Sequence, residues 1–324
     1  MEDSSLIITP KELNDRKSEL TVIDVRPKDQ QKEFPMEGLD TVVSENGAEI
    51  NGQKVLVCQF GIVTEGMIIE NKMDDTFSLL GGAQAWEEFY REQKDLSRWS
   101  RQTVLPEIEI EGQKKLLNAR VVIVGMGGLG CSIAQSLLIA GIGDLHLIDG
   151  DDVSLSNLHR QPLYSPDDVN KKKVEVAKEK LEKLNPETSI QIIDTILDEE
   201  NADVFLANSD VIIDATDNIK TRQLIDEFSK KLNIPMVYGG LFRFEGQVSV
   251  LNANSSPGYS ELFPEPPSGG DSCEDAGVLG MLPGIIGNIQ ALEAVKLIVG
   301  IEPNLIGKLL IYDGMNHSTE IIKI

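Results

Sequence analysis

The feature that most restricts the fold of this chain is a glycine turn between an apolar strand and an apolar helix. Val121–Val124 is a run of branched apolar side chains, and Leu129–Ala140 has the pattern of a buried helix. The turn between them reads Gly125-Met126-Gly127-Gly128-Leu129-Gly130. Glycines let the backbone approach a phosphate, and the helix that follows offers unpaired N–H groups and the positive end of its dipole. We therefore expect Gly125, Gly127, Gly128 and Gly130 to bind a nucleotide; a tight turn without a ligand is the alternative.

An acid at the end of the next strand supports this expectation. Leu145–Ile148 predicts the second strand of a β-α-β unit, and Asp149 follows it, nineteen positions after Gly130. A carboxylate at this distance can accept hydrogen bonds from ribose hydroxyls. The pattern by itself indicates an adenine nucleotide and leaves NAD and ATP open.

Strands and helices alternate along most of the chain, which predicts an α/β protein. Longer strands are expected over Gly246–Leu251, Leu309–Tyr312 and Thr319–Ile324, and we expect the Rossmann-like doubly wound sheet to continue into an antiparallel part. A helix is expected over Ile285–Val299. Ser255–Ala276 is rich in proline, glycine, serine and acids without periodicity, and we expect a mobile surface loop.

The length of 324 residues is enough for two domains, and a polar segment before Arg98 is the best boundary. We predict a small α/β domain over residues 1–92, a linker over 93–97 and the nucleotide-binding domain over 98–324. The first domain should contain strands over Leu6–Thr9, Thr21–Asp24, Lys54–Cys58 and Thr76–Leu80.

Charge excludes some partners. The formal net charge of −23 argues against nucleic acid and against anionic membrane surfaces. The sequence has no basic region followed by an apolar run at its start and no apolar stretch approaching membrane-spanning length. Three distant cysteines fit free thiols in a reducing compartment, so we expect a cytoplasmic protein.

Basic residues help to decide between NAD and ATP. A triphosphate needs several cations and a metal, and Arg98, Arg101, Arg160 and Lys173 can supply the cations. Asp217 follows the expected strand Val211–Asp214, so it should lie at the carboxyl end of the sheet, where it could hold magnesium. These residues favour ATP, with an NAD-dependent oxidoreductase as the alternative.

Five motifs in this order and spacing resemble the ThiF/MoeB/HesA adenylyltransferases, bacterial relatives of ubiquitin-activating enzymes. The resemblance covers about Arg98–Ile324. The motifs are Arg98-x-x-Arg101-Gln102, Gly125-x-Gly127-Gly128-Leu129-Gly130, Asp149-x-Asp151-x-x-x-x-Ser156-Asn157-Leu158-x-Arg160-Gln161, Lys173 and Thr216-Asp217-Asn218.

The resemblance implies an enzyme that uses ATP and magnesium to adenylate the C-terminal Gly-Gly carboxylate of a ubiquitin-like sulfur-carrier protein. It implies that Gly128 contacts the phosphates, that Asp149 contacts the ribose and that Asp217 serves the magnesium. Arg101 would reach in from the partner subunit of a homodimer. The other residues implied to surround the nucleotide are Asp151, Ser156, Asn157, Arg160, Gln161, Lys173 and Asn218. A non-catalytic module that binds a ubiquitin-like partner is the alternative from another class.

The sequence departs from the family at its usual zinc site. Many members hold zinc with two CxxC pairs, but here the segment Gly258–Pro264 has no cysteine and no second pair follows. We predict no zinc. Cys273 stands where related sulfur-transferring enzymes can have a cysteine that bonds to the carrier, although a loop residue without that role is an equal alternative. Cys131, just after the glycine turn, should be a core residue.

The N-terminal region looks like a rhodanese domain. Its motifs are Ile23-Asp24-Val25-Arg26, Cys58-Gln59-Phe60-Gly61-Ile62-Val63 and Leu80-Gly81-Gly82. By this resemblance Cys58 would carry a persulfide, with a cysteine desulfurase as a possible sulfur source. Because Val63 stands where an arginine is common, a degenerate docking or scaffolding domain is the other interpretation. The pathway served, whether molybdopterin, thiamine, thiolated tRNA or a sulfur-containing metabolite, is left open by the sequence.

Overall fold

The structure is a computed structural model that describes residues 6–33, 35–36, 38–44, 50, 52–92, 96–264 and 277–324. The side chains of residues 33, 91 and 92 are not described. The chain divides into two compact units, Met1–Arg98 and Trp99–Ile324. Each unit has its own hydrophobic cores and is treated by itself.

The N-terminal unit is a five-stranded parallel sheet in the order β1-β5-β4-β2-β3, with helices in the connections. The expected strands are all present, and the short strand β3 and helix α2 are additional. Strand β3 was not predicted because it is only three residues long, too short for a periodic pattern; it lies at the sheet edge with Val42 and Val43 exposed. The elements are β1 (Ile7–Ile8), α1 (Pro10–Arg16), β2 (Thr21–Asp24), α2 (Lys28–Glu33), β3 (Thr41–Val43), β4 (Lys54–Val57), α3 (Ile62–Asn71), β5 (Thr76–Leu79) and α4 (Gly82–Glu92).

The C-terminal unit contains an eight-stranded sheet in the order β13-β12-β11-β10-β9-β6-β7-β8. Strands β6 to β10 are parallel, and β11 to β13 are antiparallel, so the expected α/β fold class is confirmed. The elements are α5 (Glu109–Asn118), β6 (Arg120–Val124), α6 (Gly128–Ala140), β7 (Asp144–Ile148), α7 (Lys173–Leu184), β8 (Ser189–Ile193), α8 (Ala202–Leu206), β9 (Val211–Asp214), α9 (Ile219–Leu232), β10 (Met236–Phe242), β11 (Glu245–Leu251), α10 (Tyr259–Leu262), α12 (Leu282–Val299), β12 (Lys308–Asp313) and β13 (Ser318–Lys323).

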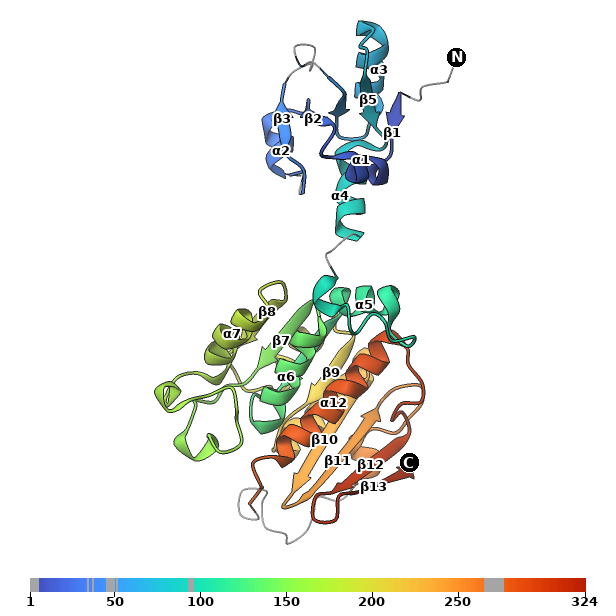
Figure 1. The fold of residues 1–324 in the computed structure, drawn as a ribbon. Coiled ribbons are helices and arrows are strands. Elements are labelled where there is room, and N and C mark those ends of the chain that lie inside the picture. The colour runs from blue at the N-terminus through green and yellow to red at the C-terminus, as the bar shows by residue number, and fades with distance from the viewer. Residues whose placement is uncertain are drawn as a thin grey trace. The chain divides into compact units, whose positions relative to one another are not determined.

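Helices cover both faces of this sheet (Figure 1). One core joins α5, α6, α7 and α12 to one face, with α12 lying across β10 and beside α6. A second core joins α8, α9 and α10 to the other face. The three layers leave the loops after the parallel strands gathered at one end of the sheet.

Among the described residues, one helix is long and apolar enough to span a bilayer, and this is α12. Half of that helix is buried inside the protein, where Leu282, Ile286 and Ala294 belong to the main core. Its apolar character is therefore explained by packing against the sheet and α6.

The expectation of a mobile loop over Ser255–Ala276 is wrong for its first part. Tyr259–Leu262 forms the short helix α10, and the carboxylate of Asp226 on α9 accepts the backbone N–H groups of Tyr259 (2.7 Å) and Ser260 (3.0 Å). The anchor comes from a residue thirty-three positions away, so no local pattern could reveal it. Residues 265–276 lie outside the described part.

Candidate active site

The order of the strands places a topological switch point beside the glycine turn. Strand β6 lies between β7 and β9. The chain therefore continues from β6 to β7 on one side and later places β9 on the other side of β6. In open α/β sheets, ligands bind at the carboxyl ends of the strands at such a switch point. The glycine turn follows β6, and Thr216–Asn218 follows β9, so both predicted segments meet there.

Two of the glycines are required by close backbone contacts. Gly125 has φ +97°, and a Cβ atom there would lie 2.7 Å from the carbonyl oxygen of Ala215. A Cβ atom at Gly130 would lie 1.9 Å from the carbonyl oxygen of Gly125. The backbone of the turn therefore packs closely against itself and against the loop that follows β9.

Asp149 braces the turn from the end of β7. One carboxylate oxygen accepts the N–H of Met126 (2.6 Å), and the other accepts the N–H of Asp151 (2.8 Å). Burial raises the pKa of Asp149, and the nearby charge of Lys173 opposes that effect. The structure thus assigns Asp149 a role in holding the turn, and its contact with ribose stays a prediction.

Lys173 is a nearly buried cation at the start of α7. Its Nζ atom lies 2.7 Å from a carboxylate oxygen of Asp151 and 3.7 Å from one of Asp149, and only 6% of its side chain is exposed. Asp151 is exposed, and it accepts the hydrogen bond from Lys173. A phosphate group could replace Asp151 as the partner of Lys173 without moving the lysine away from Asp149.

Arg160 and Gln161 line the glycine turn from the following loop. The backbone oxygen of Arg160 lies 3.1 Å from the position of a Cβ atom at Gly128, and the Gln161 amide nitrogen lies 3.6 Å from that at Gly127. Gln161 is 2% exposed, and its Oε1 atom has no hydrogen-bond partner among the described residues. Buried polar atoms are normally hydrogen-bonded, so this amide has binding capacity left for a ligand beside the turn.

The short helical turn before Arg160 contains two further predicted residues. Leu155–Asn157 is a 3₁₀ turn in which the Asn157 carbonyl accepts the N–H groups of Arg160 and Gln161. The Ser156 hydroxyl pairs with that of Ser154 at 2.8 Å, and the Ser156 carbonyl accepts a hydrogen bond from the Arg160 guanidinium. These contacts shape the loop, whereas nucleotide contacts of Ser156 and Asn157 stay predictions.

Asp217 is exposed directly after β9, and Asn218 caps α9. The Asn218 Oδ1 atom accepts the N–H groups of Lys220 (2.9 Å) and Thr221 (3.2 Å), which explains an asparagine here without a ligand. The described residues contain no group of three acidic, histidine or cysteine side chains that could hold a metal alone. One exposed carboxylate nevertheless fits magnesium carried by nucleotide phosphates, because this ion is commonly held by one or two carboxylates together with the phosphates.

Arg101 is not brought to the glycine turn within one chain. The segment around it is fixed at the C-terminal end of α6, where the Trp99 indole donates to Ile139 (2.8 Å) and the Gln102 amide donates to Ala140 (3.0 Å). The glycine turn is at the other end of this thirteen-residue helix, and at about 1.5 Å per residue the two ends are roughly 18 Å apart. An Arg101 that acts on the nucleotide must therefore come from another copy of the chain.

Sequence reasoning missed two residues that organise the site. The Tyr164 hydroxyl donates to the carbonyl of Met126 inside the glycine turn (2.9 Å). Arg222 on α9 donates to the Thr216 carbonyl (2.7 Å), directly before Asp217. A basic residue near a helix N-terminus opposes the helix dipole, and this unfavourable placement was the one available signal for Arg222.

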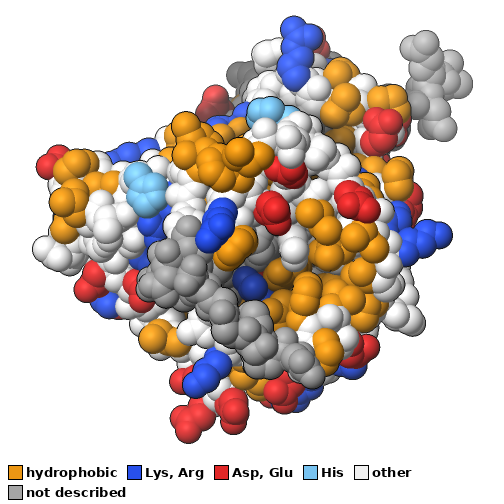
Figure 2. Space-filling model, turned by 90° about the horizontal axis from the view of Figure 1, so that it is seen from below, with side chains coloured by type: hydrophobic (Ala, Val, Ile, Leu, Met, Phe, Trp, Pro, Cys, Tyr) orange, Lys and Arg blue, Asp and Glu red, His pale blue; other side chains and the backbone are white. Residues whose placement is uncertain are grey.

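The end of the sheet that carries these loops is viewed in Figure 2. Hydrophobic side chains are spread over this face, with acidic and basic side chains scattered between them. Exposed apolar residues on elements at this end include Phe242, Phe244 and Met281.

Cys58, a predicted sulfur carrier, directly follows β4 in the N-terminal unit, in the loop that leads to α3. The Gly61 N–H donates to its sulfur at 3.1 Å, and the Thr64 hydroxyl lies 3.4 Å away. Burial raises the pKa of this thiol, but hydrogen bonds from the Thr64 hydroxyl and from loop N–H groups outweigh burial and lower it overall. The side chains of Phe60, Ile62 and Val63 beside it are exposed and uncharged.

The remaining cysteines differ. Cys131 is completely buried in the main core, and burial raises its pKa to about 12, so it is a packing residue. Cys273 lies outside the described residues.

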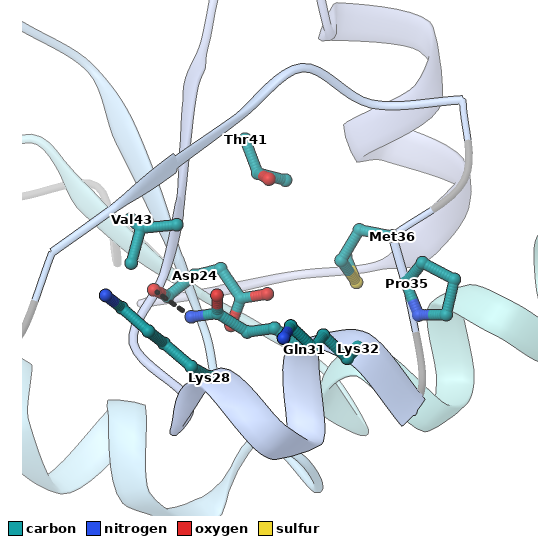
Figure 3. A pocket seen from close by; sticks show the side chains of 8 residues that line it. All are labelled: Asp24, Lys28, Gln31, Lys32, Pro35, Met36, Thr41 and Val43. Carbon is teal, nitrogen blue, oxygen red and sulfur yellow. Dashed lines mark hydrogen bonds between the residues drawn. The ribbon is translucent and has the colours of Figure 1, made fainter.

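A pocket of about 780 Å³ in the N-terminal unit lies apart from these sites (Figure 3). Among the described residues that line it, the one carboxylate is that of Asp24, which is already paired with the Arg26 guanidinium at 2.7 Å. Cys58 does not line the pocket, which therefore adds nothing to the thiol site. The lining residues are Asp24, Lys28, Gln31, Lys32, Pro35, Met36, Thr41 and Val43.

Residues 99–324 match the ThiF family. The protein named "Adenylyltransferase and sulfurtransferase MOCS3" from Drosophila sechellia is 46% identical over 222 residues, covering 68% of this chain and 49% of that protein. The "Sulfur carrier protein adenylyltransferase" of Thermus thermophilus is 41% identical over 232 residues, covering 69% of this chain and 86% of that protein. The chain thus spans about half the length of the first relative and most of the second.

Among solved structures, the crystal structure of selenomethionine-labelled PaaA is similar, with a TM-score of 0.61 and 29% identity. The match covers 71% of this chain and 73% of that chain. The similarity supports the α/β architecture described for the C-terminal unit.

Proposed function

Since the chain belongs to the ThiF family, we propose that it uses ATP to adenylate the C-terminal glycine carboxylate of a ubiquitin-like sulfur-carrier protein, with release of pyrophosphate. The names of the relatives include sulfur-carrier adenylyltransferase, which agrees with the reaction expected from the sequence motifs. The observation that carries the proposal is the meeting of Lys173, Asp149 and Gln161 around the glycine turn at the switch point of the sheet. The relatives' names support no NAD-dependent reaction.

The residues at the turn suit this chemistry. An oxygen of the carrier carboxylate attacks the α-phosphorus, the bond from that phosphorus to the bridging oxygen breaks, and pyrophosphate leaves. The attacking group is already ionised, so the enzyme needs no general base. Two anions must approach each other, and preorganised positive charge lowers the barrier. Lys173 and Arg160 supply that charge in this chain, and Asp217 would hold the magnesium that accompanies ATP.

The test is ATP–pyrophosphate exchange with each Gly-Gly carrier from the same genome. We expect exchange with one or more carriers and none with a carrier that lacks its last glycine. Asp217→Ala should abolish exchange. Asp203→Ala is the matched control, because Asp203 is an exposed carboxylate on α8 that pairs with Lys231. Equal loss in both variants, or exchange that is indifferent to the carrier, would contradict the proposal.

We also propose that Cys58 accepts sulfur in the N-terminal unit. The sulfane sulfur of a donor persulfide, such as that of a cysteine desulfurase, would pass to the Cys58 thiolate, leaving the donor as a thiol. The lowered pKa and the Gly61 hydrogen bond support this role. The apolar loop beside Cys58 supplies no cation for thiosulfate among its described residues, so we expect little thiocyanate from thiosulfate and cyanide.

Mass spectrometry after incubation with a desulfurase and cysteine tests this second proposal. The peptide containing Cys58 should gain one sulfur atom, and Cys58→Ser should abolish the gain. Cys131→Ala is the control, because Cys131 is buried and should leave the gain unchanged. A wild-type chain without the added sulfur would favour the docking or scaffolding interpretation.

The remaining expectations follow from the same family. We propose a homodimer in the cytoplasm, where thiols stay reduced. We propose that the chain works without zinc, and elemental analysis that finds stoichiometric zinc would overturn this.

A further inference from the structure

We propose that Arg222 is a positioning residue that holds the loop of Asp217 in the geometry needed to receive the magnesium–nucleotide complex. Arg222 was not part of the motifs, and its side chain is only 11% exposed. The inference rests on the proposed use of MgATP but does not depend on which carrier is adenylated.

The guanidinium closes a ring of hydrogen bonds around the residue before Asp217. Arg222 Nε donates to Asp214 (2.6 Å), and the other carboxylate oxygen of Asp214 accepts the Thr216 N–H (3.0 Å) and hydroxyl (2.6 Å). Arg222 Nη2 donates to the Thr216 carbonyl at 2.7 Å. Both backbone polar groups of Thr216 are therefore tied down directly before Asp217.

Other contacts fix the guanidinium itself. The same Nη2 atom donates to the Gly239 carbonyl of strand β10 (3.1 Å). The Arg222 guanidinium carbon lies 4.8 Å from the ring centre of Tyr238 and 5.3 Å from that of Tyr259 on α10. The two ring centres are 5.4 Å apart, so both rings lie on the guanidinium, which gains cation–π attraction from them. The loop is thus joined to its own helix, to a neighbouring strand and to α10.

This arrangement matters for Asp217 because its own side chain is exposed. An exposed carboxylate on a free loop would sample many positions, whereas magnesium demands near-ideal octahedral geometry. The hydrogen bonds of Thr216 on its N-terminal side and the Asn218 cap on its C-terminal side restrict the backbone of Asp217, and so limit the positions that its carboxylate can reach. Misplacement by about 1 Å can cost on the order of 10²-fold in rate.

The test measures affinity for α,β-methylene-ATP by calorimetry, once with magnesium and once with EDTA. The wild-type chain should bind more tightly with magnesium. Arg222→Gln should lose most of this magnesium-dependent gain, roughly tenfold in Kd, with little change in EDTA. Arg222→Lys should retain part of the gain, because the ammonium can keep one hydrogen bond but cannot form the ring. Asp217→Ala should lose the same gain, and adding Arg222→Gln to it should cost nothing further.

The control is Arg243→Gln, because Arg243 also lies over an aromatic ring, that of Phe242 at 5.2 Å, without touching the loop. If Arg222→Gln does not fold, Tyr259→Leu carries the same expectation with a smaller effect. Wild-type magnesium dependence in the folded variants would overturn the proposal, and so would an equal loss with magnesium and EDTA. A chain that shows the expected pattern but forms no acyl adenylate would lose the proposed function and keep this role of Arg222.

Discussion

The ammonium groups of Lys173 and Lys172 show how position separates two side chains of identical chemistry. Lys173 is 6% exposed and faces Asp149 and Asp151 beside the glycine turn. Lys172 is 37% exposed and pairs with Asp152 and Asp194. A buried charge is costly unless it is paired, so Asp149 and Asp151 stabilise the Lys173 ammonium, whereas the more exposed ion pairs of Lys172 contribute little.

Replacing Lys173 with methionine should therefore reduce adenylation far more than replacing Lys172. We expect Lys173→Met to lower the rate of ATP–pyrophosphate exchange by roughly 10² to 10³-fold, because it removes one preorganised charge near the phosphates. Lys172→Met should stay within about twofold of the wild type. Similar losses in the two variants would show that Lys173 has no special role.

The glycine turn permits a matched test of backbone packing. Gly130 and Gly284 are each the third residue of a helix, α6 and α12. A Cβ atom at Gly130 would lie 1.9 Å from a backbone oxygen, whereas one at Gly284 would have only the Ser132 hydroxyl nearby, at 3.8 Å. Gly130→Ala should destabilise the C-terminal unit by about 1–3 kcal/mol or more, and Gly284→Ala should be neutral or slightly stabilising.

The chain offers a clean reporter for that experiment. It has two tryptophans, Trp86 in the N-terminal unit and Trp99 in the C-terminal unit. In a Trp86→Phe background, urea unfolding followed by fluorescence reports the C-terminal unit alone. Equal stability of the two alanine variants would mean that the turn can relax around a methyl group.

At the scale of elements, the connection into α7 is held by a carboxylate with several donors. Asp168 accepts hydrogen bonds from Lys180 and from the Ser165 hydroxyl and N–H, and Lys171 donates to its other oxygen at 3.3 Å. The hydrogen bonds from Lys180 and Ser165 lower the pKa of Asp168 below its ordinary value. This carboxylate fastens the Pro166–Asp168 turn to α7, which carries Lys173 at its start.

The lowered pKa gives a pH dependence with a defined sign. A carboxylate whose pKa is lower in the folded state stabilises the fold above its unfolded pKa, near about 3.9, and loses that contribution as the pH falls below it. The difference in Tm between the wild type and Asp168→Asn should therefore be constant above about pH 5 and shrink below about pH 4. Asp167→Asn is the control, since Asp167 is the exposed neighbour, and it should show no such trend. A difference that grows in acid would contradict this account.

At the scale of the whole molecule, Arg101 lies far from the glycine turn of its own chain, although the motif assigns this arginine to the nucleotide site. Trp99 and Gln102 hold the arginine's segment at the far end of α6. In a closed symmetric dimer, a residue at one position can serve the partner's site reciprocally. Each complete site would then combine the glycine turn of one chain with Arg101 of the other chain, and the dimer would have two such sites.

Mixing two inactive variants tests this directly. Arg101→Ala and Asp217→Ala should each be inactive alone. After the mixture is unfolded and refolded together, random pairing should restore about a quarter of wild-type exchange, because each mixed dimer has one intact site. No recovery, with dimers present by light scattering, would mean that Arg101 does not act across the interface. Monomers that are fully active would overturn the dimer proposal itself.

The sequence predicted much of the fold because the relevant signals are local. Side-chain periodicity and steric limits within a few residues predicted the strand before the glycine turn and the helix after it. They also predicted that Asp149 lies at the end of a strand. Family membership rested on motifs with fixed spacing, and it is confirmed. The errors and omissions concern contacts between residues that are far apart in the sequence. The position of α10 depends on a hydrogen bond from Tyr259 to Asp226, and the position of the Arg222 guanidinium depends on Tyr238 and Tyr259, which belong to other elements.

The sequence alone therefore determined where strands and helices alternate, that a glycine turn opens a helix, and which family the chain resembles. Only the tertiary structure decided that β6 lies between β7 and β9, that Lys173 faces Asp149, and that Arg101 lies a helix length from the turn. The physical reason is that periodicity and turn sterics act between neighbours along the chain. The choice of strand neighbours, buried ion pairs and partners instead depends on contacts that form after the chain has folded back on itself.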